Sequence, residues 1–147
     1  MPHELPSGIV TLLFTDVEGS TGLLRELGPE QYEEALAEHR RLVREAFGRR
    51  GGVEMDTQGD SFFFAFPSPA EAIEAAGEGQ QALSVGPISV RMGLHTGSPH
   101  VGREGYVGED VHLAARIAAA GYGGQVLVSQ ATRALVGGEL ADLGEHR

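Results

Sequence analysis

Two aspartates in this sequence follow β-forming segments at positions where a carboxylate could bind a metal ion. Asp16 comes directly after the apolar, β-branched run of residues 8–15, and Asp60 follows Gly59 in the turn of a predicted β-hairpin. Mg²⁺ and Mn²⁺ prefer hard oxygen ligands and usually bind one or two carboxylates together with substrate phosphates. If the hairpin lies beside the first strand, both carboxylates converge at one edge of the sheet. The pair therefore predicts a divalent-metal site.

The turn after Asp16 has the composition of a phosphate site. It leads into an apolar-periodic stretch, so the free N–H groups and the positive dipole end of a helix begin here. We predict that substrate phosphate binds along this turn, at Glu18, Gly19, Ser20 and Thr21. The Glu18 charge is expected to complement the helix dipole rather than to bind metal. A structural interpretation, with Asp16 as a helix cap and Asp60 as a turn residue, has about equal weight on spacing alone.

The elements that must position these residues alternate between strand and helix patterns. An antiparallel hairpin inside such a chain predicts an α+β sandwich of the ferredoxin-like kind, with its helices on one face of the sheet. The other face would need cover, which a partner subunit could provide. The predicted order is a strand over 8–15, a helix, a helix over 29–47, a hairpin over 53–66, a helix over 69–84, a strand over 88–95, a helix over 109–119, a strand over 123–129 and a helix over 130–136.

Composition excludes several classes of function. The chain carries 11 Lys and Arg against 21 Asp and Glu, and the net charge of −10 disfavours a nucleic-acid-binding role such as that of a DNA-binding regulator. Because the chain has no Cys, a metal site must use oxygen or imidazole ligands. No apolar run approaches the ~20 residues of a membrane span. We expect a single cytoplasmic domain over 1–147, with no membrane contact of its own.

Four segments together resemble a known family. FTDVEGST at 14–21, TQGDSFFFAF at 57–66, VRMGLHTG at 90–97 and YVGEDVHLAARIAAAGYGGQVLVS at 106–129 are similar, in order and spacing, to the catalytic domain of class III adenylyl and guanylyl cyclases. The resemblance is strongest to the bacterial FTD-x-EGST subgroup and covers about residues 8–136. Because members of this family continue beyond the position of Arg147, we expect the chain to be part of a longer signalling protein.

The resemblance implies an activity and a set of site residues. A homodimer would carry its sites at the subunit interface, with two Mg²⁺ or Mn²⁺ ions in each, and would close a nucleoside triphosphate to a 3′,5′-cyclic nucleotide with release of pyrophosphate. Asp16 and Asp60 match the two metal aspartates, and the Val17 carbonyl matches a further ligand. Arg116 matches the arginine that reaches across from the other subunit to the developing phosphate charge.

Three positions depart from the family pattern. Asp56 replaces a base-reading Lys, Gly105 replaces a base-reading Asp, and His112 replaces the Asn that orients the ribose. An imidazole can donate one hydrogen bond as an amide does, so His112 can replace Asn in part. Two hypotheses stay open: a cyclase, using ATP in preference, with altered base selectivity, or a catalytically silent cyclase-homology module that binds nucleotide or signals by dimerising. We expect a structural role for His95 and solvated positions for Arg40, Arg41 and Arg103.

Overall fold

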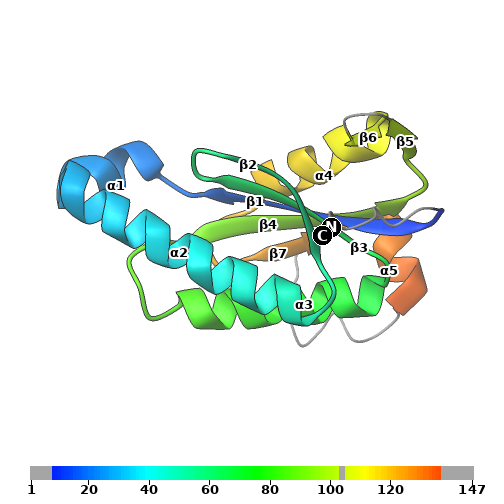
Figure 1. Ribbon diagram of the computed structural model, residues 1–147, viewed down its shortest axis with the longest axis horizontal. Coiled ribbons are helices and arrows are strands. Elements are labelled where there is room, and N and C mark those ends of the chain that lie inside the picture. Colours follow the sequence, from blue (N-terminus) through cyan, green and yellow to red (C-terminus); the bar gives the residue numbers. More distant parts are fainter. Residues whose placement is uncertain (1–7, 103–104, 137–147) are drawn as a thin grey trace.

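A five-stranded sheet forms the centre of the computed structural model, which describes residues 8–102 and 105–136. Its strand order is β2-β3-β1-β4-β7, so β1 lies in the middle and pairs antiparallel with both β3 and β4 (Figure 1). β2 pairs antiparallel with β3, and β7 pairs parallel with β4. The strands of this sheet are β1 (Val10–Val17), β2 (Val53–Gln58), β3 (Ser61–Phe66), β4 (Val90–Gly97) and β7 (Val126–Val128).

Helices α2 and α3 pack on one face of the sheet and enclose the larger core. Phe47 of α2 meets Phe64 of β3 edge to face, with ring centroids 4.9 Å apart. Pro29 is the first residue of α2 and follows Gly28, which ends α1, so the two helices join without an intervening loop. The helices are α1 (Ser20–Leu27), α2 (Pro29–Arg49), α3 (Pro69–Leu83), α4 (Glu109–Ala119) and α5 (Gln130–Val136). In the described part of the chain, we find no helix whose length and apolarity suit a bilayer.

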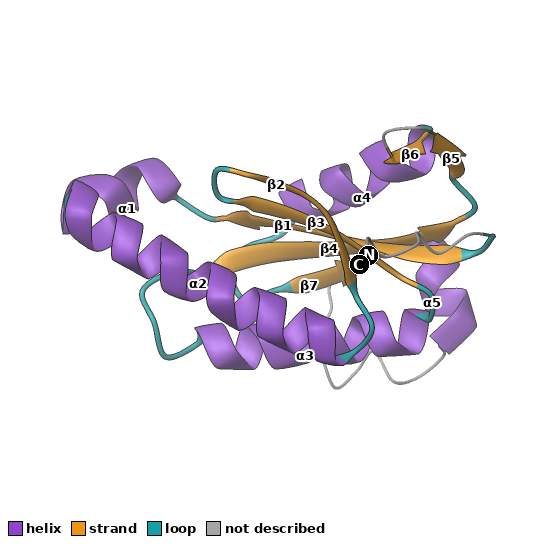
Figure 2. Cartoon of the chain, viewed as in Figure 1, coloured by secondary structure: helices purple, strands orange, loops and turns teal. Residues whose placement is uncertain are grey.

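The expectation that helices cover one face alone is wrong, because α4 crosses the opposite face (Figure 2). It approaches β4 closely where Gly93 has no side chain: a Cβ atom there would lie 2.3 Å from the backbone nitrogen of Ala118. Helical periodicity alone specifies a buried stripe but not the sheet face that it meets. Farther along this face Phe14 and Phe63 stay partly exposed, with ring centroids 6.4 Å apart.

The predicted element order is confirmed, with one addition. A small hairpin of β5 (His100–Gly102) and β6 (Gly105–Val107) forms within the Gly-rich stretch before α4. Its strands are too short to give an alternating pattern in the sequence. The α+β fold class is confirmed, and the predicted final strand narrows to the three residues of β7.

Candidate functional site

The structure places Asp16 and Asp60 at the same end of the sheet. Thr15 of β1 pairs with Phe62 of β3, so Asp16 is the next residue beyond that pair on one strand, and Asp60 is two residues away in the β2–β3 turn. Because β1 and β3 are antiparallel neighbours, the end of β1 and the start of β3 lie at the same end of the sheet. The predicted convergence of the two carboxylates at one sheet edge is confirmed at the level of strand register.

The Asp16 carboxylate is paired with a positively charged side chain. Its register partner on β4 is Arg91, whose Nε donates to Oδ1 at 2.7 Å and whose Nη2 donates to Oδ2 at 2.8 Å. Both side chains are largely buried, with 20% of Asp16 and 27% of Arg91 exposed. The hydrogen bonds to Asp16 raise the pKa of Arg91, and the charges of Asp16, Glu18 and Asp60 add to this effect. The guanidinium therefore stays charged in the middle of an acidic cluster.

The donor set at this edge fits a hard divalent cation. The Asp16 carboxylate accepts from a planar cation through both oxygens, and Asp60 lies close enough for its charge to act on the same guanidinium. Oxygen donors of this kind are those that Mg²⁺ and Mn²⁺ prefer. Within residues 8–102 and 105–136, no group of three or more His, Asp or Glu side chains forms a ready-made metal cage. Backbone and substrate oxygens would have to complete such a site.

Helix α1 begins at Ser20, soon after Asp16 in the sequence, as predicted. Gly19 precedes it at φ +63°, and within residues 8–102 and 105–136 no side chain caps its first turn, which leaves backbone N–H groups for another acceptor. Glu18 lies outside this turn, and its carboxylate lies against Gly123, where a Cβ atom would be 2.6 Å from Glu18 Oε1. That the charge of Glu18 complements the helix dipole stays a prediction.

Two residues of α2 brace this region, and the sequence analysis did not assign them to it. Tyr32 is hydrogen-bonded to Ser20 in the first turn of α1; burial raises the pKa of Tyr32, and the nearby Asp60 charge raises it further. Arg40 Nη2 donates to the carbonyl oxygen of Gly59, next to Asp60 in the turn. The expectation that Arg40 is solvated is therefore wrong, whereas Arg41 is exposed, and Arg103 lies outside the described residues. The i, i+8 spacing of Tyr32 and Arg40 was a signal that both lie on one helix face.

The remaining predicted residues lie on β2, β6 and α4. His112 and Arg116 are exposed, one turn apart on α4, while Ala114 and Ala118 face the sheet. Gly105 begins β6 in the small hairpin. The backbone of Asp56 pairs with Phe63, and its side chain is outside the described part of the structure.

The sequence matches a known protein family. Residues 4–143 match the adenylate and guanylate cyclase catalytic domain. The chain belongs to this family. An uncharacterized protein of Mycobacterium tuberculosis is 41% identical over 149 residues, which are 96% of this chain and 52% of the relative. A receptor-type adenylate cyclase of Trypanosoma equiperdum is 32% identical over 178 residues, covering 88% of this chain and 38% of that protein.

Solved structures agree with the family assignment. An adenylate cyclase of Trypanosoma brucei, solved in its monomeric state, superimposes with a TM-score of 0.82 at 30% identity, covering 93% of this chain and 80% of that chain. This cyclase domain spans about half the length of the mycobacterial relative and less of the trypanosomal one. The similarity therefore concerns the catalytic domain.

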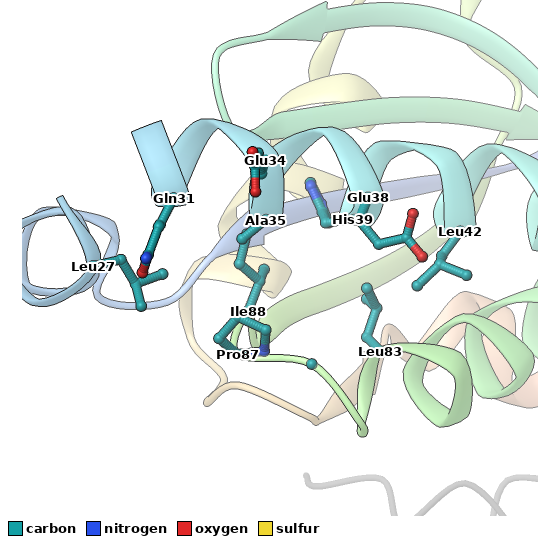
Figure 3. A pocket seen from close by; sticks show the side chains of 11 residues that line it. Leu27, Gln31, Glu34, Ala35, Glu38, His39, Leu42, Leu83, Pro87 and Ile88 are labelled. Atoms are coloured by element: carbon teal, nitrogen blue, oxygen red, sulfur yellow. The ribbon is translucent and has the colours of Figure 1, made fainter. Parts of the chain in front are cut away.

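A separate pocket of about 380 Å³ lies between α2 and the segment that runs from the end of α3 toward β4 (Figure 3). Its walls are mainly aliphatic, and neither aspartate belongs to its lining, so it is not the candidate catalytic site of the cyclase domain. His39 lines it and is buried; its Nδ1–H donates to the Leu36 carbonyl at 3.3 Å, and its Nε2 has no hydrogen-bond partner among the described residues. Burial lowers the pKa of His39, which favours the neutral form of the ring. The other lining residues are Leu27, Gln31, Glu34, Ala35, Glu38, Leu42, Leu83, Gly86, Pro87 and Ile88.

Proposed function

We propose that this domain is a metal-dependent nucleotidyl cyclase that converts a nucleoside triphosphate, ATP in preference, to a 3′,5′-cyclic nucleotide and pyrophosphate. The observation that carries the proposal is the shared sheet edge of Asp16 and Asp60, beside the uncapped start of α1, in a chain of the cyclase family. Carboxylates and free backbone N–H groups are the two kinds of group that a metal-bound triphosphate requires.

Each residue has a defined task in this proposal. Asp16, Asp60 and the Val17 carbonyl would hold two Mg²⁺ or Mn²⁺ ions, which when bound neutralise triphosphate charge and activate the ribose 3′-hydroxyl. The N–H groups at the start of α1 orient the triphosphate. Tyr32 and Arg40 keep this turn and the Asp60 turn in place through Ser20 and Gly59.

A homodimer would complete the site. Arg116 and His112 project from the exposed side of α4, and in the described structure the Arg116 side chain makes no ion pair, so its charge is available to a second subunit. The partly exposed Phe14, Phe63 and Met55 on the α4 face of the sheet offer apolar surface for such contact. In this arrangement Arg116 stabilises phosphate charge, and His112 donates to the ribose in place of an amide.

Selection among the four bases would depend on Asp56 and Gly105, which differ from the family pattern. An ionised Asp56 offers only hydrogen-bond acceptors, and Gly105 offers no side chain. A carboxylate near the base favours an exocyclic amino group over a carbonyl, so ATP and CTP should bind better than UTP. Discrimination should be weak, because a single buried polar mismatch costs about 1–3 kcal/mol.

The test is to incubate the protein with Mn²⁺ and each of the four triphosphates and to identify cyclic products by mass spectrometry. We expect cyclic AMP from the parent and none from Asp60→Asn, while Glu109→Gln, an exposed carboxylate on α4, keeps the activity. Competition binding of the four triphosphates to the parent and to Asp56→Ala measures base preference. If no triphosphate is cyclised but Mn²⁺ and nucleotide bind in a manner that needs both aspartates, the silent nucleotide-binding module is the correct alternative.

A further inference from the structure

Arg91 occupies the same carboxylate oxygens that a metal ion would need. Its two hydrogen bonds, at 2.7 and 2.8 Å, use one acceptor site on each oxygen of Asp16, so a divalent ion must either share this carboxylate with the guanidinium or displace it. A bidentate, charge-assisted pair of hydrogen bonds is among the stronger polar interactions in proteins. Its position is also fixed, because Asp16 and Arg91 are register partners on adjacent central strands.

We propose that Arg91 is a positioning residue that competes with the divalent metal for Asp16. When metal and nucleotide bind together, its guanidinium leaves Asp16 and pairs with the triphosphate. This inference rests on the proposed function. Its consequence is that metal alone binds weakly and that metal and nucleotide bind cooperatively.

The surroundings of Arg91 suit such an exchange. Its Nη1 lies 3.5 Å from the carbonyl oxygen of Ala119 at the C-terminal end of α4, which is the negative end of that helix dipole. The guanidinium therefore keeps an electronegative neighbour when it leaves Asp16. Glu18 and Asp60 also act on it, so it remains at the site edge where the triphosphate would place negative charge.

A purely structural role makes a different prediction. If the pair only joins β1 to β4, loss of Arg91 lowers stability and leaves an unpaired, partly buried carboxylate, but does not specifically alter metal affinity. If Arg91 competes with metal, its loss strengthens the binding of metal alone. Mn²⁺ affinity without nucleotide therefore separates the two roles.

The experiment titrates Mn²⁺ into the purified parent protein, Arg91→Gln, Arg91→Lys and Arg41→Gln, with free Mn²⁺ measured by electron paramagnetic resonance. Arg41→Gln is the matched control: it removes the same charge from an exposed arginine paired with Glu38 and Glu45. We expect Arg91→Gln to bind Mn²⁺ about tenfold more tightly than the parent, Arg91→Lys to lie between them, and Arg41→Gln to match the parent. A non-hydrolysable ATP analogue should strengthen Mn²⁺ binding more in the parent than in Arg91→Gln.

Circular dichroism establishes that each variant is folded. If folded Arg91→Gln binds Mn²⁺ no more tightly than the parent, while the parent binds Mn²⁺ with nucleotide and Asp16→Asn does not, the competition is refuted and the proposed function stands. If none of the proteins binds Mn²⁺ with or without nucleotide, both proposals fall. If neither Arg91 variant folds, the pair is a structural link and the inference is overturned.

Discussion

His95 Nε2 lies 2.7 Å from Oδ1 of Asp110, and the other ring nitrogen of His95 lies 2.9 Å from the hydroxyl of Ser129. These contacts join β4 to the first turn of α4 and to the residue before α5. The His95 side chain is only 10% exposed, so both ring nitrogens are satisfied inside the protein. The network supports the structural role expected of this histidine, and it fixes the helix that carries Arg116.

Replacement of Asp110 by Ala should therefore destabilise the protein by about 1–2 kcal/mol, because it leaves a nearly buried imidazole nitrogen without its partner. Glu109→Ala is the matched control, since it removes an exposed carboxylate from the same helix turn and should cost about 0.5 kcal/mol or less. Urea denaturation measures the free energy of unfolding of both variants. Equal losses for the two variants would show that the His95 contact adds nothing to stability.

Arg40→Met should weaken Mn²⁺-nucleotide binding by about tenfold, as is usual when a group that orients a ligand is lost. Stability should change little, because the substitution removes the bond to Gly59 but also removes a buried Nε that has no hydrogen-bond partner in the part of the chain that the structure describes. Arg41→Met, at the exposed neighbouring position, should leave both quantities unchanged. Calorimetric titration and thermal melts compare the two variants, and identical nucleotide affinities would contradict a role for Arg40 at the Asp60 turn.

Two inactive chains should complement each other if the site is shared. An Asp60→Ala chain lacks a metal ligand and an Arg116→Ala chain lacks the cross-subunit charge, yet their heterodimer contains one site with both residues intact. Mixing them should restore about half of the activity per heterodimer that the parent dimer shows. The measurement is cyclic nucleotide production by co-purified, differently tagged chains. Heterodimers that form without any recovery would argue for sites within single subunits.

The stability of the protein should fall as pH drops below about 6.5. Burial lowers the pKa of His39, so in mildly acidic solution the unfolded chain binds a proton that the folded chain does not. The contribution of His39 to stability is therefore complete above the pKa that His39 has in the unfolded chain. It is lost as the pH falls toward the lower pKa of His39 in the folded chain. His39→Phe, which keeps a ring against Phe62, should show a smaller decrease in stability on acidification, whereas exposed His100→Gln should behave as the parent does. Urea denaturation over a pH series provides the comparison.

Local patterns were sufficient to predict the hairpin that carries Asp60 and the order of the elements, but the strand predicted over 8–15 continues through Asp16 to Val17. The partnership of Asp16 with Arg91 was not predictable in this way, because these residues are 75 positions apart and meet only through the register of β1 and β4. Arg40 and Arg41 are equally basic, and the contact of Arg40 with Gly59 depends on how α2 packs against the β2–β3 turn. The face on which α4 lies was also decided by tertiary contacts, chiefly the absence of a side chain at Gly93.

Helix α1 buries none of its eight residues completely, although it provides the turn assigned to phosphate. Helices this short are marginal unless packing supports them, so α1 should open locally at a small fraction of the free energy needed to unfold the sheet. An anion at its N-terminus would then order the helix as it binds, and part of the binding free energy would be used in that ordering. Affinity for the triphosphate and hydrogen-exchange protection of the α1 amides are consequently two measures of a single equilibrium.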